Sequence, residues 1–227
     1  MIPRPENPLI VALDVSRIEE AERLAATLAP HVGMLKIGLE LFWAYGPEAV
    51  RRMATHGRLF VDSKLHDIPS TVERAAANIA RLGIDMLNVH ALGGDAMMRA
   101  ALEGAARGSS EAGCSMPLVL AVTVLSSQGG EDLASPASLA FEAKAAGLDG
   151  VVVSGDDVRD VRAVCGDGFC LVVPGIRPAG SNGDDQVRVL TPGEAIERGA
   201  DYLVVGRPIT GASDPAGVAR SILRDIP

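Results

Sequence analysis

The sequence predicts an α/β fold, a (β/α)8 TIM barrel in a single domain over residues 1–227, from three observations. Eight short apolar runs are spaced along the chain, segments of helical periodicity separate them, and one tripeptide pattern recurs before three of the runs. The chain has 227 residues, of which 48% are hydrophobic, so it is long enough to bury one large core. No linker divides it, and strand alternates with helix throughout.

The predicted strands are short runs rich in aliphatic and β-branched residues. They are Leu9–Leu13, Met34–Ile37, Leu59–Lys64, Asp85–His90, Leu118–Val124, Gly150–Val153, Cys170–Val173 and Tyr202–Val205. Runs such as Val151-Val152-Val153 are apolar on both faces, which requires cover on both sides. A parallel sheet flanked by helices supplies that cover.

Segments with helical spacing and few breakers lie between the strands. They include Arg17–Ala29, Thr71–Leu82, Ala96–Arg107, Ala137–Ala146 and Pro215–Arg224. A Gly-x-Asp pattern precedes three of the predicted strands, and glycine there can take the left-handed conformation that ends a helix. The three copies are Gly83-Ile84-Asp85, Gly147-Leu148-Asp149 and Gly199-Ala200-Asp201. We therefore expect the same helix-to-strand joint three times.

An open doubly wound sheet is the alternative to a closed barrel. A dinucleotide-binding sheet of that kind carries Gly-x-Gly-x-x-Gly after its first strand, but here that strand ends in Asp14-Val15-Ser16. The count of eight strands favours the barrel.

The charge balance excludes some classes of function. The formal net charge of −8 argues against partners rich in phosphate, such as nucleic acids and anionic membranes. No apolar run reaches the roughly 18 residues that span a bilayer, and the first residues lack the apolar core of a signal peptide. We expect a cytoplasmic protein that acts on a small molecule.

Polar residues at the carboxyl ends of barrel strands are candidates for the active site. Asp62 and Lys64 lie two apart on one strand, so their side chains point to the same side, and Asp67 follows in the next turn. A structural ion-pair network is the alternative reading of this cluster, but Lys36 one strand away favours a site. The strand-end candidates are Asp14, Lys36, Asp62, Lys64, His90, Arg177, Gly206 and Arg207.

The loops after strands 7 and 8 of such barrels commonly bind phosphate, and here they carry Gly175-Ile176-Arg177 and Gly206-Arg207. We therefore expect a phosphorylated substrate; otherwise the glycines only turn the chain and the arginines are solvated. The segment Gly175–Leu190 is predicted to be a mobile phosphate-gating loop because it is rich in Pro, Gly, Asn and Asp. No metal is expected, because an ammonium between two carboxylates competes with Mg²⁺.

The run Asp62-Ser63-Lys64-Leu65-His66-Asp67-Ile68-Pro69-Ser70-Thr71 resembles the Asp-x-Lys-x-x-Asp-Ile-Pro segment of the orotidine 5′-monophosphate decarboxylase family. Ser70 departs from the Asn that is frequent in that family. Further segments resemble the family in the same order, so that the resemblance covers essentially the whole chain. They are Leu13-Asp14, Leu35-Lys36-Ile37-Gly38, Thr123-Val124-Leu125-Ser126-Ser127, Pro174-Gly175-Ile176-Arg177, Asp185-Gln186 and Val205-Gly206-Arg207-Pro208.

The resemblance implies cofactor-free conversion of orotidine 5′-monophosphate to uridine 5′-monophosphate and CO2 in pyrimidine biosynthesis. It implies that Lys64, with Asp62 and Asp67, is catalytic and donates the proton. It also implies a homodimer in which Asp67 and Thr71 reach the neighbouring subunit's site. The remaining roles carried over from the family are ribose binding by Asp14 and Lys36, contact with the pyrimidine by Ser126, and phosphate binding by Arg177, Gln186, Gly206 and Arg207.

Loss of CO2 from this substrate leaves negative charge on a ring carbon, so electrostatic stabilisation has to replace an electron sink. Lys64 can supply the cation, and its carboxylate neighbours favour the protonated amine over the neutral amine that imine formation needs. Two alternatives stay open: a Mg²⁺-dependent sugar-phosphate lyase or aldolase, which shares Asp-x-Lys-x-x-Asp, and a catalytically silent phosphate-binding barrel. The Ile-Pro extension and the Gly-Ile-Arg…Gln loop favour the decarboxylase.

Overall fold

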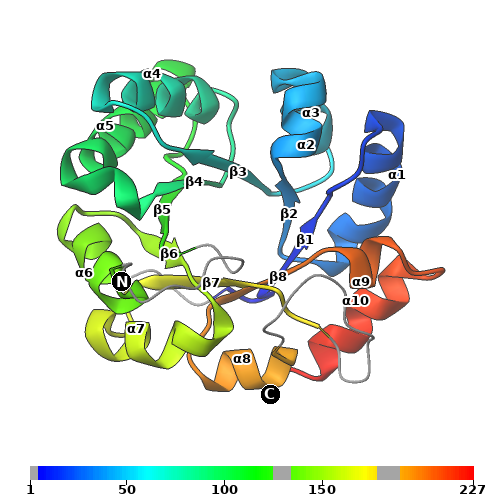
Figure 1. Cartoon of the computed structure of the whole chain (residues 1–227). Coiled ribbons are helices and arrows are strands. Elements are labelled where there is room, and N and C mark those ends of the chain that lie inside the picture. The colour runs from blue at the N-terminus through cyan, green and yellow to red at the C-terminus, as the bar shows by residue number, and fades with distance from the viewer. Residues whose placement is uncertain (1–4, 125–133, 178–189) are drawn as a thin grey trace.

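The computed structural model is a closed barrel of eight parallel strands in the order β1 to β8, each paired with its neighbours along the chain (Figure 1). It describes residues 5–124, 134–177 and 190–227. The predicted (β/α)8 fold is confirmed. The strands are β1 (Leu9–Ala12), β2 (Met34–Ile37), β3 (Leu59–Leu65), β4 (Met86–His90), β5 (Leu118–Val122), β6 (Gly150–Val152), β7 (Cys170–Pro174) and β8 (Tyr202–Val205).

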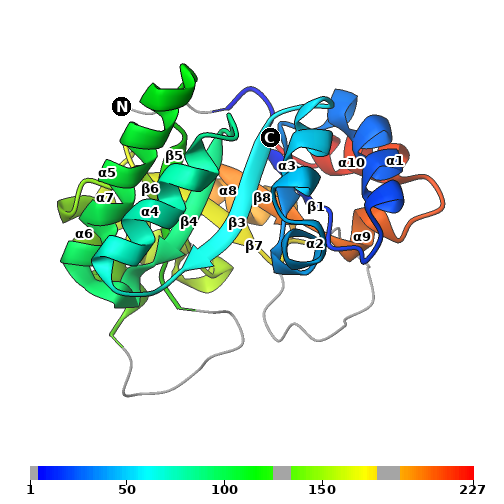
Figure 2. The ribbon, with the colours of Figure 1, turned by 90° about the horizontal axis from the view of Figure 1, so that it is seen from above.

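Helices surround the strands, and two views at right angles place α4 beside α5 on one side of the barrel and α1 beside α10 on another (Figures 1 and 2). Among the helices that the structure describes, none combines the length and apolarity needed to cross a membrane. The helices are α1 (Ile18–Leu28), α2 (Leu39–Tyr45), α3 (Pro47–Ala54), α4 (Pro69–Ala80), α5 (Gly94–Ala112), α6 (Pro136–Ala145), α7 (Val158–Cys165), α8 (Pro192–Glu197), α9 (Arg207–Thr210) and α10 (Pro215–Arg224), with 3-10 turns η1 (Ala29–His31), η2 (Ala91–Gly93) and η3 (Gly155–Asp157).

The observed elements differ from the predicted ones mainly at their ends. β2, β8 and α10 have the predicted bounds, and β1, β5 and β6 end one or two residues early. Helices α2, α3, α7, α8 and α9 were not among the helices named from periodicity. Each has at most eight residues, which is little more than two turns and too short for a clear apolar stripe.

The sequence marks the first residue of three helices by an N-cap residue followed by proline. Ser135, Thr191 and Asp214 each accept a hydrogen bond from a backbone N–H of the first turn, and a proline follows each of them. Thr191 and Glu194 form a reciprocal capping box at the start of α8. These signals fix where α6, α8 and α10 begin even though two of the helices follow segments outside the described residues.

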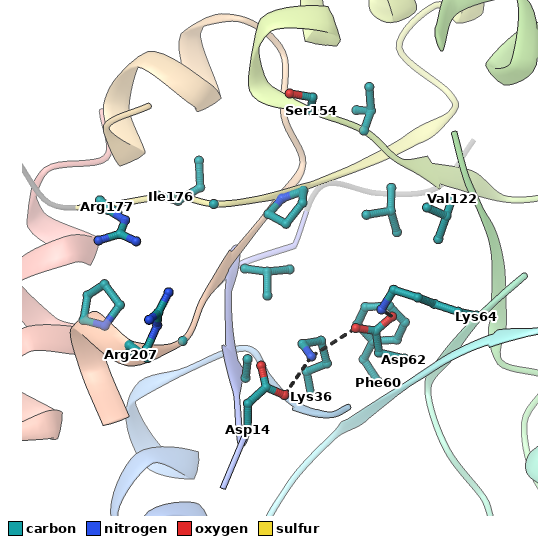
Figure 3. A pocket seen from close by; sticks show the side chains of 18 of the residues that line it. Asp14, Lys36, Phe60, Asp62, Lys64, Val122, Ser154, Ile176, Arg177 and Arg207 are labelled. Atoms are coloured by element: carbon teal, nitrogen blue, oxygen red, sulfur yellow. Dashed lines mark hydrogen bonds and ion pairs between the residues drawn. The ribbon is translucent and has the colours of Figure 1, made fainter. Parts of the chain in front are cut away.

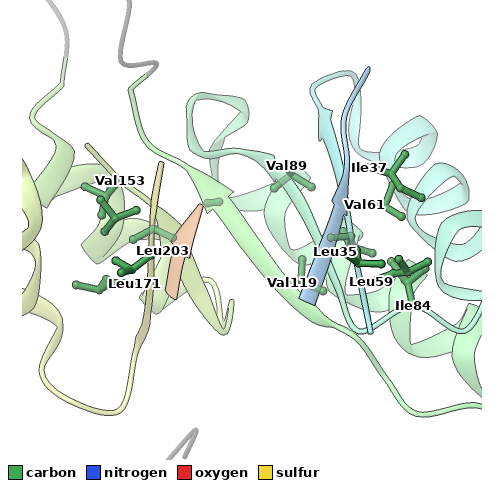
Figure 4. Close-up of a cluster of buried hydrophobic side chains, with 14 of the residues drawn as sticks. Leu35, Ile37, Leu59, Val61, Ile84, Val89, Val119, Val153, Leu171 and Leu203 are labelled. Atoms are coloured by element: carbon green, nitrogen blue, oxygen red, sulfur yellow. The ribbon is translucent and has the colours of Figure 1, made fainter. Parts of the chain in front are cut away.

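Alternation along the strands divides the core into two layers. On β2, Met34 and Lys36 face the inside of the barrel, while Leu35 and Ile37 pack under the helices, as Figure 4 shows. The helix-facing layer is the larger and is built from aliphatic side chains of every strand. The apolar residues that fill the barrel are Ile10, Ala12, Met34, Phe60, Met86, Leu120, Cys170, Val172, Tyr202 and Val204.

The predicted helix-to-strand joints are confirmed at the amino ends of β4, β6 and β8. Their glycines have φ of 70° at Gly83, 93° at Gly147 and 109° at Gly199, a conformation that favours glycine. The aspartate of each joint accepts a hydrogen bond from a backbone N–H in the first two residues of the preceding strand. The pairs are Asp85 with Leu59 at 2.9 Å, Asp149 with Val119 at 2.8 Å and Asp201 with Leu171 at 2.8 Å. Each joint thus ties two neighbouring strands together.

Candidate active site

A pocket of about 500 Å³ opens at the carboxyl ends of the strands, above the apolar filling of the barrel (Figure 3). Lysine and aspartate side chains from β2 and β3 lie at one end of it, and arginines that follow β7 and β8 lie at the other. Val122, Val152 and Pro174 supply an apolar wall to the same pocket. The lining therefore combines two charged ends with apolar side chains.

Four of the predicted residues form a chain of alternating charge. Lys36 Nζ lies 3.2 Å from Asp14 Oδ1 and 3.0 Å from Asp62 Oδ2. Lys64 Nζ donates to Asp62 Oδ1 over 2.6 Å. Gly38 leaves room for this chain, because a Cβ at that position would lie 2.5 Å from Asp14 Oδ1. The chain brings two ammonium groups and two carboxylates together from three neighbouring strands.

Within this row of alternating charges, each group favours the ionised form of its neighbour despite burial. Burial opposes the charge of Lys36, but Asp62 and Asp14 outweigh that effect and raise the pKa of Lys36. Burial alone would raise the pKa of Asp62, yet Lys36, Lys64 and the hydrogen bond from Asn88 lower it to about 2. Asp62 is therefore a carboxylate at neutral pH, and Lys36 is an ammonium.

Lys64 reaches the pocket through an irregularity in β3. The pairing of β3 with β4 shifts register between Val61 and Leu65, and Lys64 has φ of 47°. This left-handed conformation is uncommon for residues other than glycine. The N–H of Lys64 donates to Asn88 Oδ1 over 2.7 Å instead of to a strand carbonyl. Asp62 and Lys64 do share one side, as predicted, but the strand between them is not regular.

The opposite end of the pocket carries the guanidinium groups of Arg177 and Arg207, which Figure 3 shows on the same side. Arg177 is buried, whereas Arg207 is exposed at the start of α9. Gly175 and Gly206 also line the pocket here. The N–H of Arg177 donates to the carbonyl of Leu190 over 3.0 Å, so the two ends of the predicted gating loop lie side by side. Two cations next to glycine backbone form a suitable site for a phosphate.

Some predicted residues do not line the pocket. Asp67 is exposed, and its Oδ1 accepts from the N–H of Ile68; within the described chain no ion pair joins Asp67 to Lys64. Thr71 lies in the first turn of α4 and also lies outside the lining. Ser126 and Gln186 fall in residues 125–133 and 178–189, outside the described residues, as does most of the gating segment.

The two histidines near the mouth of the barrel contact each other and do not belong to the row of alternating charges. The rings of His66 and His90 lie 5.5 Å apart between centroids. Burial, with His66 and Lys64 nearby, lowers the pKa of His90. His90 therefore stays neutral to lower pH than an ordinary histidine does.

Sequence reasoning missed four polar residues, one of which is Thr210 in the pocket lining at the end of α9. Glu40, in the first turn of α2, lines the pocket and accepts a 2.5 Å hydrogen bond from Ser16 Oγ. Ser154 lines the pocket after β6. Asn88 lies inside β4 and contacts both Asp62 and Lys64. Glu40 and Ser154 satisfy the same strand-end rule that selected Asp14, and a lone amide between Leu87 and Val89 was the signal for Asn88.

The arrangement can hold a molecule with an anionic group at one end and a reacting centre at the other. The arginine end favours a phosphate, and the lysine end favours negative charge that forms during a reaction, since preorganised cations stabilise developing charge in a partly desolvated site. Both oxygens of Asp62 are already bonded to Lys36, Lys64 and Asn88. The ammonium groups thus occupy the positions that a metal cation would take beside Asp62.

Comparison with known proteins gives a consistent result. The family described as "Orotidine 5′-phosphate decarboxylase / HUMPS family" matches residues 7–222. The chain is 47% identical to orotidine 5′-phosphate decarboxylase of Moorella thermoacetica over 97% of this chain and 92% of that protein. It is 46% identical to the Nitratidesulfovibrio vulgaris protein of the same name over 96% and 97%. The crystal structure of orotidine 5′-phosphate decarboxylase from Lactobacillus acidophilus aligns with a TM-score of 0.84 and 38% identity over 97% of this chain and 99% of that one.

Proposed function

We propose that this chain, which belongs to the orotidine 5′-phosphate decarboxylase / HUMPS family, converts orotidine 5′-phosphate to uridine 5′-phosphate and CO2. The observation that carries the proposal is one pocket with the Asp62–Lys64 pair at one end and Arg177 with Arg207 at the other. Near-full-length likeness to proteins named for this decarboxylation supports it over a sugar-phosphate lyase of the same family.

The proposed binding mode follows the polarity of the pocket. The phosphate binds between Arg177, Gly206 and Arg207, and the ribose hydroxyls bond to Asp14 and Lys36. This orientation places the pyrimidine ring beside Lys64, against the apolar wall. Ser126 and Gln186 complete the contacts to the ring and the phosphate in this proposal.

The proposed chemistry has two steps at one carbon of the ring. The bond from C6 to the carboxylate breaks, CO2 leaves, and the electron pair stays on C6, where no adjacent carbonyl delocalises it. The Lys64 ammonium stabilises this charge and then transfers its proton to C6, and solvent returns a proton to the amine. Asp62, held ionised, accepts the hydrogen bond from Lys64 Nζ and fixes where that group lies before the reaction.

The same arrangement supports a reaction without a cofactor. A carbanion on a ring without an electron sink needs a nearby cation, and Lys64 is one that also carries a proton. Lys36 is a second cation of the same cluster, and its Nζ lies 3.0 Å from Asp62 Oδ2. We propose that these two lysines supply the electrostatic stabilisation.

We also propose a homodimer whose interface surrounds the mouth of the barrel. Large apolar side chains are exposed after β2, β3 and β4: Trp43 is 80% exposed, Ile68 64%, Leu92 45% and Leu39 43%. An apolar patch beside an active site is typical of a protein interface. Asp67 and Thr71, on the loop and helix that carry Ile68, would then reach the neighbouring subunit's site. That the enzyme acts in de novo pyrimidine biosynthesis in the cytoplasm is part of the same proposal.

The phosphate-gating role of Gly175–Leu190 stays a prediction, because residues 178–189 lie outside the described residues. The single-domain organisation over residues 1–227 likewise stays a proposal. It is supported by one barrel that uses all eight described strands.

The proposed function is tested by following the absorbance loss of orotidine 5′-phosphate. We expect turnover that persists in the presence of a chelator. Orotidine, which lacks the phosphate, is the matched control substrate and should react far more slowly, because phosphate binding energy is no longer available to the transition state. No turnover of orotidine 5′-phosphate, or turnover that a chelator abolishes, contradicts the proposal.

A further inference from the structure

Asn88 on β4 uses its whole side-chain amide on the two residues at the centre of the proposed chemistry. It is 1% exposed. Its Nδ2 donates to Asp62 Oδ1 over 2.8 Å, and its Oδ1 accepts from the N–H of Lys64 over 2.7 Å. Its main-chain carbonyl accepts from Ser63 Oγ over 2.8 Å. One residue of β4 therefore bonds to three consecutive residues of β3.

These bonds replace the regular ladder where β3 is irregular. Val61 pairs with Leu87 and Leu65 pairs with Val89, so four steps along β3 match two steps along β4. The surplus residues include Lys64, whose left-handed backbone is unfavourable for a residue other than glycine. Such strain persists only where the surroundings hold it. The Asn88 amide offers the Lys64 N–H the acceptor that the broken ladder does not.

We propose that Asn88 is a positioning residue for decarboxylation, which holds the Lys64 backbone and the Asp62 carboxylate in the relative placement that aims Lys64 at the ring. The inference rests on the proposed function. An amide suits the task because it holds a donor group and an acceptor oxygen in one rigid plane. It is also neutral, so the balance between two lysines and two aspartates is kept.

The first experiment compares Asn88→Ala with Ser63→Ala. Ser63→Ala is the matched control, because it removes a hydrogen bond of 2.8 Å between the same two strands without a contact to the Asp62 carboxylate. For Asn88→Ala we expect kcat to fall about 100-fold, the effect of a misplacement of about 1 Å, with KM changed only a few-fold. The control should keep kcat within about 2-fold, since its bond touches neither reacting group.

The second experiment uses Asn88→Asp. It distinguishes a side chain that positions Asp62 and Lys64 from one that only helps β3 to pair with β4. A protonated carboxyl at this place can still donate to Asp62 and accept from Lys64, whereas a carboxylate cannot donate. Two carboxyls this close share one proton, so one of them has a strongly raised pKa. We expect kcat of Asn88→Asp to rise as pH falls through that pKa, while the wild type shows no such rise.

The new carboxyl would face charged groups from β2, from the neighbouring β3 and from its own strand, whereas β5 on the other side of β4, Leu118–Val122, is apolar throughout. The titratable groups around it are Lys36 on β2, Asp62 and Lys64 on β3, His66 after β3 and His90 on β4. The two lysines lower the shared pKa and Asp62 raises it. Unfolding measured over the same pH range distinguishes a change in kcat from a change in stability.

Three results overturn the inference: kcat of Asn88→Ala within about 2-fold of the wild type, an equal loss in Ser63→Ala, or an Asn88→Asp activity that is low at every pH. Should Asn88→Ala not fold, Asn88→Asp carries the test. A crystal structure of either variant adds a readout besides activity, because Lys64 should leave its left-handed conformation in Asn88→Ala. That readout stays valid if the wild type fails to decarboxylate orotidine 5′-phosphate, which would refute only the proposed function.

Discussion

Aspartates lie at both ends of the barrel strands, and their partners differ. At the amino ends, Asp85, Asp149 and Asp201 each accept a hydrogen bond from a backbone N–H near the start of a neighbouring strand. At the carboxyl ends, Asp14 and Asp62 lie beside the ammonium group of Lys36, and Asp62 also bonds to Lys64. Every aspartate of the first group bonds to a strand N–H, and Asp85 and Asp201 also pair with an arginine away from the pocket. The second group bonds to lysines beside the pocket.

The net pKa shift differs between one aspartate of each group, Asp149 and Asp62, although burial raises the pKa of both. At Asp149, burial raises the pKa and the N–H of Val119 opposes it only in part. At Asp62, burial also raises the pKa, but two lysines and Asn88 reverse the direction and bring it to about 2. The amino-end joints therefore serve pairing of the strands, and the carboxyl-end cluster keeps charges ionised where a substrate can bind.

The largest expected effect tests whether the site at the carboxyl ends of the barrel strands is built from one subunit or from two. Lys64→Ala and Asp67→Ala subunits should each be nearly inactive alone, and mixing them should regenerate activity. With random pairing in a two-fold dimer, about half of the dimers are mixed and one of their two sites is intact, so about a quarter of wild-type activity should return. The measurement is the rate of decarboxylation after the subunits are mixed and exchanged.

If mixed dimers are shown to form and no activity returns, each site is built from one chain. Asp67 would then have no role across the interface. The amino-end joints offer the internal comparison, because each is formed within one chain and should be unaffected by mixing.

The next effect is on stability at the amino end. Asp201→Ala leaves the Leu171 N–H without its side-chain acceptor and removes the 2.7 Å ion pair with Arg162, both in a mostly buried place. We expect the free energy of unfolding to fall by about 3 kcal/mol. Turnover per folded molecule should stay near the wild-type value. Urea unfolding and the absorbance assay measure the two quantities.

Asp167→Ala is the matched control for Asp201→Ala, because Asp167 is exposed in the loop before β7. It should change stability by less than about 0.5 kcal/mol. A large loss of turnover in folded Asp201→Ala, with stability unchanged, would contradict the assignment of stability to the amino-end joints and catalysis to the carboxyl-end cluster.

The smallest predicted effect is the pH dependence that Asp62 contributes. Its folded pKa of about 2 lies below the ordinary value of 3.8, so ionisation of Asp62 stabilises the fold above the ordinary value and the stabilisation is lost as pH falls toward 2. From about pH 5 to about pH 3 the loss from this group should be about 1 kcal/mol. Asp62→Asn should lack that part of the pH dependence in urea unfolding. Identical slopes for the two proteins would contradict the depressed pKa.

Much of the fold could be predicted because its signals are local. The Gly-x-Asp joints and the apolar runs determine where most strands begin, and both are visible in the sequence. The break between α2 and α3 at Gly46, with φ of 57°, was not predicted. Neither segment is long enough to show a periodic stripe by itself.

The candidate site could be predicted where residues follow strand ends, and less well where tertiary contacts decide. Asp14, Lys36, Asp62 and Lys64 were found by position, and the structure brings them together. The left-handed backbone of Lys64 depends on Asn88, a contact between strands that spacing along β3 cannot reveal. The proposed roles of Asp67 and Thr71 in a second subunit's site, and those of Ser126 and Gln186, stay predictions.

The central claim is that charge at the carboxyl end drives the decarboxylation, and Lys64→Ala tests it most directly. The measurement is kcat for orotidine 5′-phosphate beside the affinity for uridine 5′-phosphate, in a variant shown to be folded. We expect kcat to fall by several orders of magnitude, roughly 1,000-fold or more, because an electrostatic contribution of this kind is among the largest in catalysis. Nucleotide binding should survive in part, since Arg177 and Arg207 lie at the other end of the pocket. A variant that keeps more than about a tenth of wild-type turnover would contradict the claim.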